Sequence, residues 1–246
     1  MNILVCVSKT PDTTAKVDFT SDSKTYNEEG KQFIMNPYDE WYALVRALEL
    51  KESGGGEVII INVGPSSNDP TLRKGLAIGA DKAVRVDAED RDAFFVATQI
   101  AAYAAENNFD LILCGKETID YNGSLVGSML AEMLGLPFIS FASKMEYADG
   151  VATLNRDIEG GVEVVKVKAP FVLSASKGLA EQRIPNMRGI MMAKRKPLEV
   201  ISAVEIEGGA KIEKFELPAS KGAVKMVDPN NMDELVRLLN EEAKII

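Results

Sequence analysis

The residues best suited to bind a ligand lie between Gly115 and Ser124, directly after the apolar run Leu111–Cys114. If that run is a strand and a helix follows, this segment lies at the carboxyl edge of a parallel sheet, where open α/β sheets bind ligands. Free backbone N–H groups and the helix dipole favour an anion there, and glycines allow close approach. The segment also fits an ordinary strand–helix turn with Asn122 or Ser124 as the helix cap.

Two shorter motifs carry polar or conformationally restricted residues beside predicted elements. Asn36-Pro37-Tyr38-Asp39 precedes a helical pattern, and Val63-Gly64-Pro65 ends an apolar run. The first motif can supply polar contacts to a ligand, or it is simply a helix start with Asp39 as cap. The second places backbone groups where they could meet a base. The chain has neither a Walker motif nor a dinucleotide glycine fingerprint.

Several chemistries are excluded by composition. The chain has no histidine, which excludes Ser-His-Asp and Cys-His catalysis and histidine-ligated metals. Its two cysteines cannot build a four-thiolate zinc site. Cys6 and Cys114 lie inside apolar runs and are predicted to be buried structural thiols.

Charge and length give the broad class. The 246 residues suffice for one large domain, or one domain with an appendage. A net charge of −9, from 37 acids and 28 bases, disfavours nucleic acid as a partner. No apolar run is long enough to cross a bilayer, so no membrane insertion is expected. The first residues lack the pattern of a secretory signal, so a reducing cytoplasm is the expected compartment.

The elements that must position these residues alternate between strand and helix. The predicted strands are short and rich in Val, Ile and Leu, as in strands covered on both faces: Ile3–Val7, Val58–Val63, Ala83–Val86 and Leu111–Cys114. Between or after them lie four helical patterns, at residues 39–52, from Asn68, at 90–107 and at 123–135. This order predicts an α/β fold with a parallel sheet flanked by helices.

The second half of the chain changes character. Residues 144–174 alternate around turns at Asp149-Gly150 and Gly160-Gly161, which predicts an antiparallel hairpin at the sheet edge. Residues 174–197 lose periodicity and carry six basic residues against Glu181, so they are either a partner surface or a solvated loop. We therefore expect a domain over residues 1–200, followed by an arm over 201–246 that ends in a helix near residues 231–244.

Five ordered blocks together resemble the small, or beta, subunit of electron transfer flavoproteins, along nearly the whole chain. The blocks are Asn36-Pro37-Tyr38-Asp39-Glu40, Leu76-Ala77-Ile78-Gly79-Ala80-Asp81, Gly115-Lys116-Glu117-Thr118-Ile119-Asp120, Arg156-Asp157-Ile158-Glu159-Gly160-Gly161-Val162-Glu163 leading to Pro170, and Arg188-Gly189-Ile190 followed by Ala193-Lys194-Arg195-Lys196-Pro197.

This resemblance implies an electron carrier rather than an enzyme. Members of that family pair with a larger alpha subunit, which holds most of an FAD that faces the beta subunit. The beta subunit has a Rossmann-like, adenine-nucleotide-binding fold and buries AMP. The pair takes electrons from dehydrogenases, often the acyl-CoA dehydrogenases of fatty acid oxidation, and passes them to a quinone-linked oxidoreductase or another acceptor.

The resemblance also implies ligand contacts, and they fall on the loops at the expected sheet edge. The matching cofactor-binding positions are Cys6, Asn36, Pro37, Tyr38, Asp39, Val63, Gly115, Lys116, Glu117, Thr118, Ile119, Asp120, Tyr121, Asn122, Gly123, Ser124, Leu125 and Val126. At Cys6 the expected contact is the backbone.

Partner contacts are implied in two places. The family's recognition loop matches residues 183–194, within the predicted domain, and its apolar anchor matches Met187. The acid that ties the beta subunit to the mobile flavin domain matches Asp157; the alternative is an exposed strand charge. The partner-binding positions are Asp157, Arg183, Ile184, Pro185, Met187, Arg188, Ile190 and Met191.

Two departures from the family pattern bear on the ligand. An aromatic residue that some relatives place beside the flavin matches Thr13 here. AMP-binding relatives have threonine where this chain has Val126, which cannot donate a hydroxyl hydrogen bond to phosphate; Ser124 offers a substitute. Val126-Gly127 resembles instead the electron-bifurcating branch, whose beta subunit holds a second FAD in place of AMP and which oxidises NADH.

Overall fold

The computed structural model describes residues 1–89 and 92–246. The helices and strands, with two short turns η1 and η2, follow one another in this order: β1 Asn2–Cys6, β2 Lys9–Pro11, β3 Phe33–Met35, α1 Asp39–Gly54, β4 Glu57–Gly64, η1 Ser66–Asn68, α2 Asp69–Ile78, β5 Lys82–Asp87, α3 Ala93–Glu106, β6 Leu111–Gly115, α4 Val126–Leu134, β7 Phe138–Ala148, β8 Val151–Ile158, β9 Gly161–Lys168, β10 Phe171–Ala175, α5 Met187–Ala193, β11 Leu198–Ser202, α6 Met232–Arg237 and η2 Leu238–Glu242.

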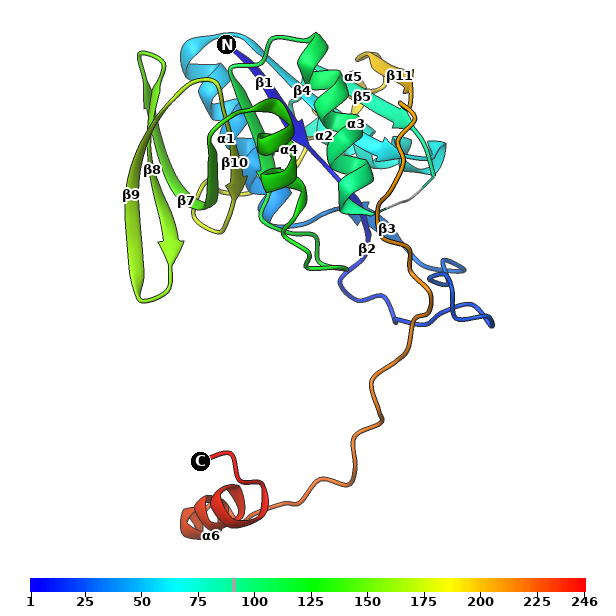
Figure 1. Ribbon diagram of the computed structural model, residues 1–246, viewed down its shortest axis with the longest axis vertical. Helices are drawn as coiled ribbons and strands as arrows, with labels where there is room; N and C mark the ends of the chain where they lie inside the picture. Colours follow the sequence, from blue (N-terminus) through cyan, green and yellow to red (C-terminus); the bar gives the residue numbers. More distant parts are fainter. Residues whose placement is uncertain (90–91) are drawn as a thin grey trace. The chain divides into compact units, whose positions relative to one another are not determined.

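The main sheet confirms the predicted α/β class. Its strand order is β11-β5-β4-β1-β6-β10-β7-β8-β9 (Figure 1). Neighbours from β11 to β7 are parallel, while β7 pairs with β8 and β8 with β9 in antiparallel register. The expected antiparallel extension therefore exists at one edge of the parallel sheet. A separate antiparallel pair, β2 with β3, follows β1 in the chain.

Helices cover both faces of the parallel strands, as the apolar strand sequences predict. Alternate residues of β1 face opposite layers: Ile3 and Val5 pack with α1 and α2, while Leu4 and Cys6 pack with α3 and α4. All four side chains are buried. Figure 1 shows α3 and α4 side by side on the face opposite α1. The polar loops that follow the strands therefore project from a rigid, doubly covered sheet.

The second half of the chain differs from the prediction in two places. The last residues of the hairpin prediction, from Phe171 to Ser174, belong instead to the parallel strand β10 (Phe171–Ala175) between β6 and β7. Its five residues are all buried, which is why it lies inside the sheet and not at its edge. Met187–Ala193, expected to be irregular, forms the short helix α5, where the Asn186 side chain accepts a hydrogen bond from the Gly189 N–H.

Two compact units divide the chain. The first comprises residues 1–17 and 27–213 and contains the main sheet. The second comprises residues 18–26 and 214–246. Within the second unit, the Phe19 and Phe215 rings stack with centroids 4.8 Å apart, and α6 lies near the expected closing helix.

The predicted start of α3 at Asp90 lies outside the described residues. The cap of α3 is Asp92, whose side chain accepts a hydrogen bond from the Phe95 N–H.

Candidate functional site

The sheet order places a switch point between β1 and β6. From β1 the chain runs through β4 to β5 on one side, then returns through α3 to β6 on the other side of β1. In open α/β sheets the strand exits diverge at such a point and leave a crevice for a ligand. The segments that follow β1 and β6, and the segment that starts α1, meet there.

Asn36 joins these segments. Its side chain is fully buried; its Nδ2 donates to the Glu117 carbonyl at 3.0 Å, and its Oδ1 accepts from the Ile119 N–H at 3.0 Å. Its own N–H donates to the Ser8 carbonyl at 2.8 Å. Asn36 thus fixes the loop after β6, through its carboxamide, against the exit of β1, through its backbone N–H, and it brings together two motifs that lie about eighty residues apart.

The loop after β6 is open where the sequence predicts ligand contacts. Residues 120–125 are exposed, whereas residues 115–119 are half-buried. Asn122 and Ser124 have φ of 50° and 52°, so the backbone turns twice through the left-handed region. Neither residue caps α4; the cap position is Leu125, which makes no side-chain cap bond. The cap interpretation of Asn122 and Ser124 is therefore wrong, and the Ser124 hydroxyl donates to Glu117 Oε2 at 3.4 Å.

The prediction that Asp39 caps α1 is also wrong. The cap position is Tyr38, at φ 65° and without a side-chain cap bond, and Asp39 is the first residue of α1. Tyr38 is 52% exposed while Pro37 is buried. Asp39 faces the crevice loop, and partial burial raises the pKa of its carboxyl above the ordinary value. The motif thus places one aromatic and one carboxyl beside the loop.

Charge in the crevice is mostly negative, with one lysine. The Lys116 ammonium lies 2.9 Å from Glu117 Oε1. This hydrogen-bonded pair lowers the pKa of Glu117 and raises the pKa of Lys116. An arriving phosphate would compete with Glu117 for that ammonium. Of the loop's backbone N–H groups, those of Lys116, Ile119, Tyr121 and Asn122 already donate within the chain, so an anion would rely on the others.

Two linked asparagine side chains near the end of β4 were not predicted from the sequence. The Asn62 Nδ2 donates to the Val7 carbonyl at 2.9 Å, and the Asn68 Nδ2 donates to Asn62 Oδ1 at 2.9 Å. This chain fixes the orientation of both amides and leaves Asn68 Oδ1, which is buried, without a hydrogen-bond donor. A signal existed, because Asn62 interrupts an otherwise apolar strand; Asn68 was predicted only as the start of a helical pattern.

Glycines in the site have different neighbours. A Cβ on Gly123 would have nothing within 4 Å, so the loop leaves open space there. A Cβ on Gly115 would lie 2.6 Å from Glu40 Cγ, and one on Gly64 2.2 Å from Asn68 Nδ2. Gly115 and Gly64 are therefore required by packing within the chain, while Gly123 faces free volume.

Cys6 and Cys114 are free and buried, as predicted. They lie on neighbouring strands, and a hydrogen bond between the two thiols, together with burial, raises the pKa of Cys6 well above its ordinary value. The Cys6 sulfur therefore stays protonated, which leaves the backbone of Cys6 as the group available to a ligand.

The predicted partner segment is fastened at both ends. Arg183 forms a bidentate ion pair with Glu52, at 2.5 and 2.9 Å, and its carbonyl accepts from the Trp41 indole at 3.1 Å. At the far end, Lys196 Nζ donates to carbonyls at the end of α2, the shortest being Ala80 at 2.5 Å. Arg73 donates to the carbonyls of Ala193 and Lys196.

Between these anchors the segment exposes apolar side chains. Ile184, Met187 and Met191 are 89%, 74% and 68% exposed. Pro185 is half-buried, and Arg188 and Ile190 are exposed. Arg183 itself is engaged within the chain, so the exposed surface is more apolar than the sequence indicates. Asp157 is exposed near the end of β8, where its Oδ1 accepts from the Ser143 hydroxyl at 2.9 Å.

Within residues 1–89 and 92–246, no helix has the length and apolar character needed to cross a bilayer. Over the same residues, no group of three or more His, Cys, Asp or Glu side chains is arranged so that it could hold a metal ion.

The fold is that of an α/β protein with a strand-order switch point between β1 and β6. A family model described as "Electron transfer flavoprotein domain" matches residues 23–206. The chain is 36% identical to the electron transfer flavoprotein subunit beta of Bacillus subtilis, with full coverage of both chains. It is 37% identical to that of Syntrophomonas wolfei, over 93% of this chain and 90% of the relative. It is 33% identical to the mitochondrial subunit of Arabidopsis thaliana, again over both full lengths.

The chain therefore belongs to the family of electron transfer flavoprotein beta subunits. This confirms the resemblance stated from the five sequence blocks.

Proposed function

We propose that this chain is one half of a heterodimeric electron carrier and that it holds AMP as a structural ligand in the crevice between β1 and β6. Its partner is the alpha subunit, and an FAD at the interface carries the electrons. The donors are acyl-CoA and other dehydrogenases, and the acceptor is a quinone-linked oxidoreductase. The observation that carries this proposal is the Asn36 bridge, because it assembles the predicted loops into one site at the edge where such sheets bind nucleotides.

Two features of the crevice fit an adenine nucleotide. Asn68 Oδ1 is a buried acceptor without a donor beside Val63 and Gly64, and the exocyclic amine of adenine is a donor. The free volume at Gly123 lies on the loop that leads into α4, where backbone N–H groups suit a phosphate. In this proposal Lys116 exchanges its pairing with Glu117 for the phosphate.

The chain's own residues bind and orient rather than react. A bound flavin supplies the oxidation–reduction chemistry. The protein contributes a rigid sheet, a nucleotide that fills the crevice, and a surface for partners. Because a ligand that binds only the folded chain stabilises it, AMP in this role acts on folding and on subunit association.

One residue favours a second candidate, a bifurcating beta subunit that holds FAD in the crevice and oxidises NADH. Val126 is the first residue of α4 and offers no hydroxyl to a phosphate. Gly127 does not add to this evidence, because a Cβ there would lie 3.0 Å from the Phe138 ring, which gives the glycine a packing reason.

Extraction of the ligands from the purified heterodimer separates the two candidates. One flavin and one AMP per heterodimer supports the structural-nucleotide proposal. Two flavins per heterodimer supports the bifurcating candidate. A heterodimer without any adenine nucleotide in this chain contradicts both.

We further propose that the apolar segment around Met187 docks the electron donor and that Asp157 ties this chain to the flavin domain of the alpha subunit. Met187 is 74% exposed on a segment held at both ends, so it can fill a partner's pocket without rearrangement. Asp157 is exposed and carries no internal ion pair among the described residues, so its charge is available to a partner's cation.

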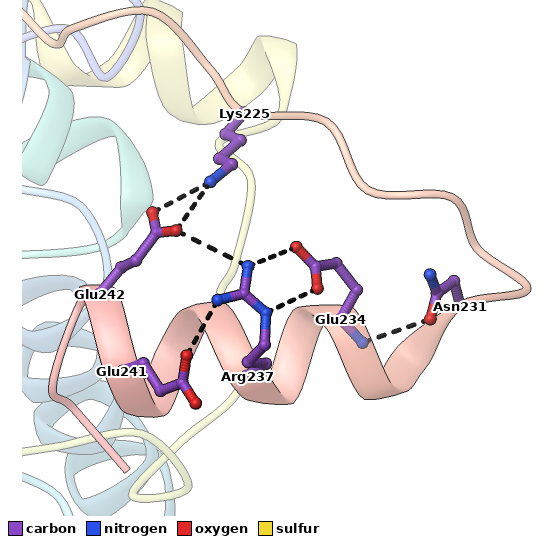
Figure 2. Close-up of polar contacts among 6 residues, drawn as sticks. All are labelled: Lys225, Asn231, Glu234, Arg237, Glu241 and Glu242. Atoms are coloured by element: carbon purple, nitrogen blue, oxygen red, sulfur yellow. Dashed lines mark hydrogen bonds and ion pairs between the residues drawn. The ribbon is translucent and has the colours of Figure 1, made fainter.

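The arm, residues 201–246, is proposed to pack on the alpha subunit. Figure 2 shows how its helix is held: Arg237 pairs with Glu234 at 2.7 Å and with Glu241 at 2.9 Å, and Lys225 pairs with Glu242 at 3.0 Å. Asn231 caps the helix through the Glu234 N–H. The arm also exposes apolar side chains, at Val224, Met226, Met232, Val236 and Ile245, which a partner surface would cover.

A further inference from the structure

Glu40 is a buried carboxyl to which the proposed function assigns no role. It is the second residue of α1, and its side chain is only 5% exposed. Both of its oxygens are engaged by one residue: Oε2 accepts from the Ser8 N–H at 2.6 Å, and Oε1 lies 2.8 Å from the Ser8 Oγ, which donates to the carboxylate and accepts from the protonated acid. A buried carboxyl that reaches across to another element needs a reason beyond packing.

Its position is the switch point itself. Ser8 follows β1, and Gly115 ends β6, the neighbouring strand. A Cβ on Gly115 would lie 2.6 Å from Glu40 Cγ and 2.9 Å from its backbone nitrogen. Glu40 therefore lies between the ends of the two strands on either side of the crevice. It is hydrogen-bonded to the segment after β1 and packed against the end of β6.

The charges around Glu40 do not favour its ionised form. The carboxyls of Asp39, on its own helix, and of Asp120, on the loop after β6, both act on it, and the Cys6 thiol lies within reach of its charge on β1. Lys116 pairs with Glu117 instead. Burial is the largest cause, and together these groups raise the pKa of Glu40 to about 8 in spite of the bonds from Ser8.

We propose that Glu40 is a positioning residue that joins the exits of β1 and β6 as the uncharged acid, so that a nucleotide phosphate in the crevice and the ionised Glu40 exclude each other. This inference rests on the proposed nucleotide site. A phosphate brings further negative charge to a place that already holds two carboxylates and a third buried carboxyl. Binding therefore favours the protonated side chain, and nucleotide affinity falls as Glu40 ionises.

The test is AMP binding to the full-length heterodimer, freed of its co-purifying nucleotide, by titration calorimetry between pH 7 and 9. The phosphate of AMP is about nine-tenths ionised at pH 7 and more so above it, so its own titration contributes little. If only the protonated form binds, the dissociation constant rises about tenfold from pH 7 to pH 9. At pH 8 about half a proton is taken up for each AMP bound, which appears as a dependence of the binding enthalpy on the buffer's ionisation enthalpy.

Glu40→Gln keeps the shape of the neutral acid and can still accept from and donate to Ser8. It should bind AMP at pH 7 as the wild type does and lose the pH dependence. Glu106→Gln, an exposed residue at the end of α3, is the matched control and should keep the tenfold change.

The outcomes separate this inference from the proposed function. Wild-type AMP affinity that is the same at pH 7 and 9, without proton uptake at pH 8, overturns the role of Glu40 and leaves the nucleotide site standing. The proton-uptake measurement needs no variant, so it decides the matter even if Glu40→Gln does not fold. A wild type that binds no AMP at any pH overturns the nucleotide site and this inference together.

Discussion

At the residue scale, Asn36 and Glu40 have related roles, one just before the start of α1 and the other just after it. Asn36 fixes the loop after β6, and Glu40 holds the residue that follows β1. Both are buried, and each satisfies its polar atoms by bonding to backbone or to a hydroxyl of another segment. Buried polar groups bonded in this way specify a single arrangement of the loops, because any other arrangement leaves them without partners.

The raised pKa of Glu40 predicts how stability depends on pH. The ordinary pKa is 4.5 and the folded value is about 8, so between these values the folded chain holds a proton that the unfolded chain releases. The contribution of Glu40 is therefore fully present below pH 4.5 and is lost as pH rises toward 8. In the absence of nucleotide, Glu40→Gln should gain about 2.5 kcal/mol in free energy of unfolding over wild type between pH 5.5 and 7.5.

Urea unfolding at several pH values measures this difference, with Glu106→Gln as the control that should follow the wild type. Parallel stability curves for Glu40→Gln and wild type would show that Glu40 keeps an ordinary pKa in the folded chain.

Gly123→Val separates binding from folding. The open space at Gly123 accepts a larger side chain without a clash inside the chain, so the free energy of unfolding without ligand should change by less than about 0.5 kcal/mol. The same side chain crowds a phosphate on this loop, so AMP affinity should fall at least about tenfold. Gly54→Val, at the end of α1 with equally open space, should leave AMP binding intact. Retention of AMP by Gly123→Val would place the phosphate elsewhere.

At the element scale, the sequence predicted the parallel strands and the helices because burial on both faces leaves a clear apolar pattern. The predicted run Leu111–Cys114 differs from β6 by one residue, and the predicted helix start at Asp39 is correct. Strand β10 was missed because its five residues follow a hairpin directly, and their pattern does not distinguish a central strand from the end of a hairpin.

Helix ends and contacts across the fold were less predictable. The cap positions of α1 and α4 are Tyr38 and Leu125, whose side chains make no cap bond, so a search for polar caps selects the wrong residues. The loops of the site were found from their place after strands. The partners of Asn36, Glu40 and Asn68 depend on segments distant in the chain, and local pattern carries no information about them.

Two variants in helix α5 are expected to impair partner docking, each for a different physical reason. Met187 is mostly exposed, so Met187→Ala should slow electron transfer from the dehydrogenase with little change in stability. Gly189 packs on α2, where a Cβ would lie 2.4 Å from the Ala77 carbonyl oxygen. Gly189→Ala should therefore displace α5, slow transfer and lower the free energy of unfolding by about 1–3 kcal/mol.

Stopped-flow transfer kinetics and urea unfolding of the heterodimer test the pair, with Gly54→Ala as a control in open space. Unchanged transfer in both variants would remove α5 from the docking surface. The flavin spectrum should be the same in all three variants.

At the scale of the whole molecule, a nucleotide in the crevice should couple binding to thermal stability. Free AMP at about one hundred times its dissociation constant should stabilise the folded state by about 2.7 kcal/mol, a rise of roughly 5–10 °C in Tm for a protein of this size. GMP carries an acceptor where AMP carries the amine, so it cannot donate to Asn68 Oδ1 at that position and should shift Tm much less. Equal shifts with AMP and GMP would contradict adenine recognition by Asn68.

The segment held by Arg183 at one end and Lys196 at the other has a consequence for how contacts are made and broken. A surface that is already ordered loses little conformational freedom when it meets another protein, so few contacts are enough for recognition. Such an encounter can be specific and brief at the same time. A shuttle that must release one protein before it reaches the next gains from that combination, since its turnover depends on separation as much as on capture.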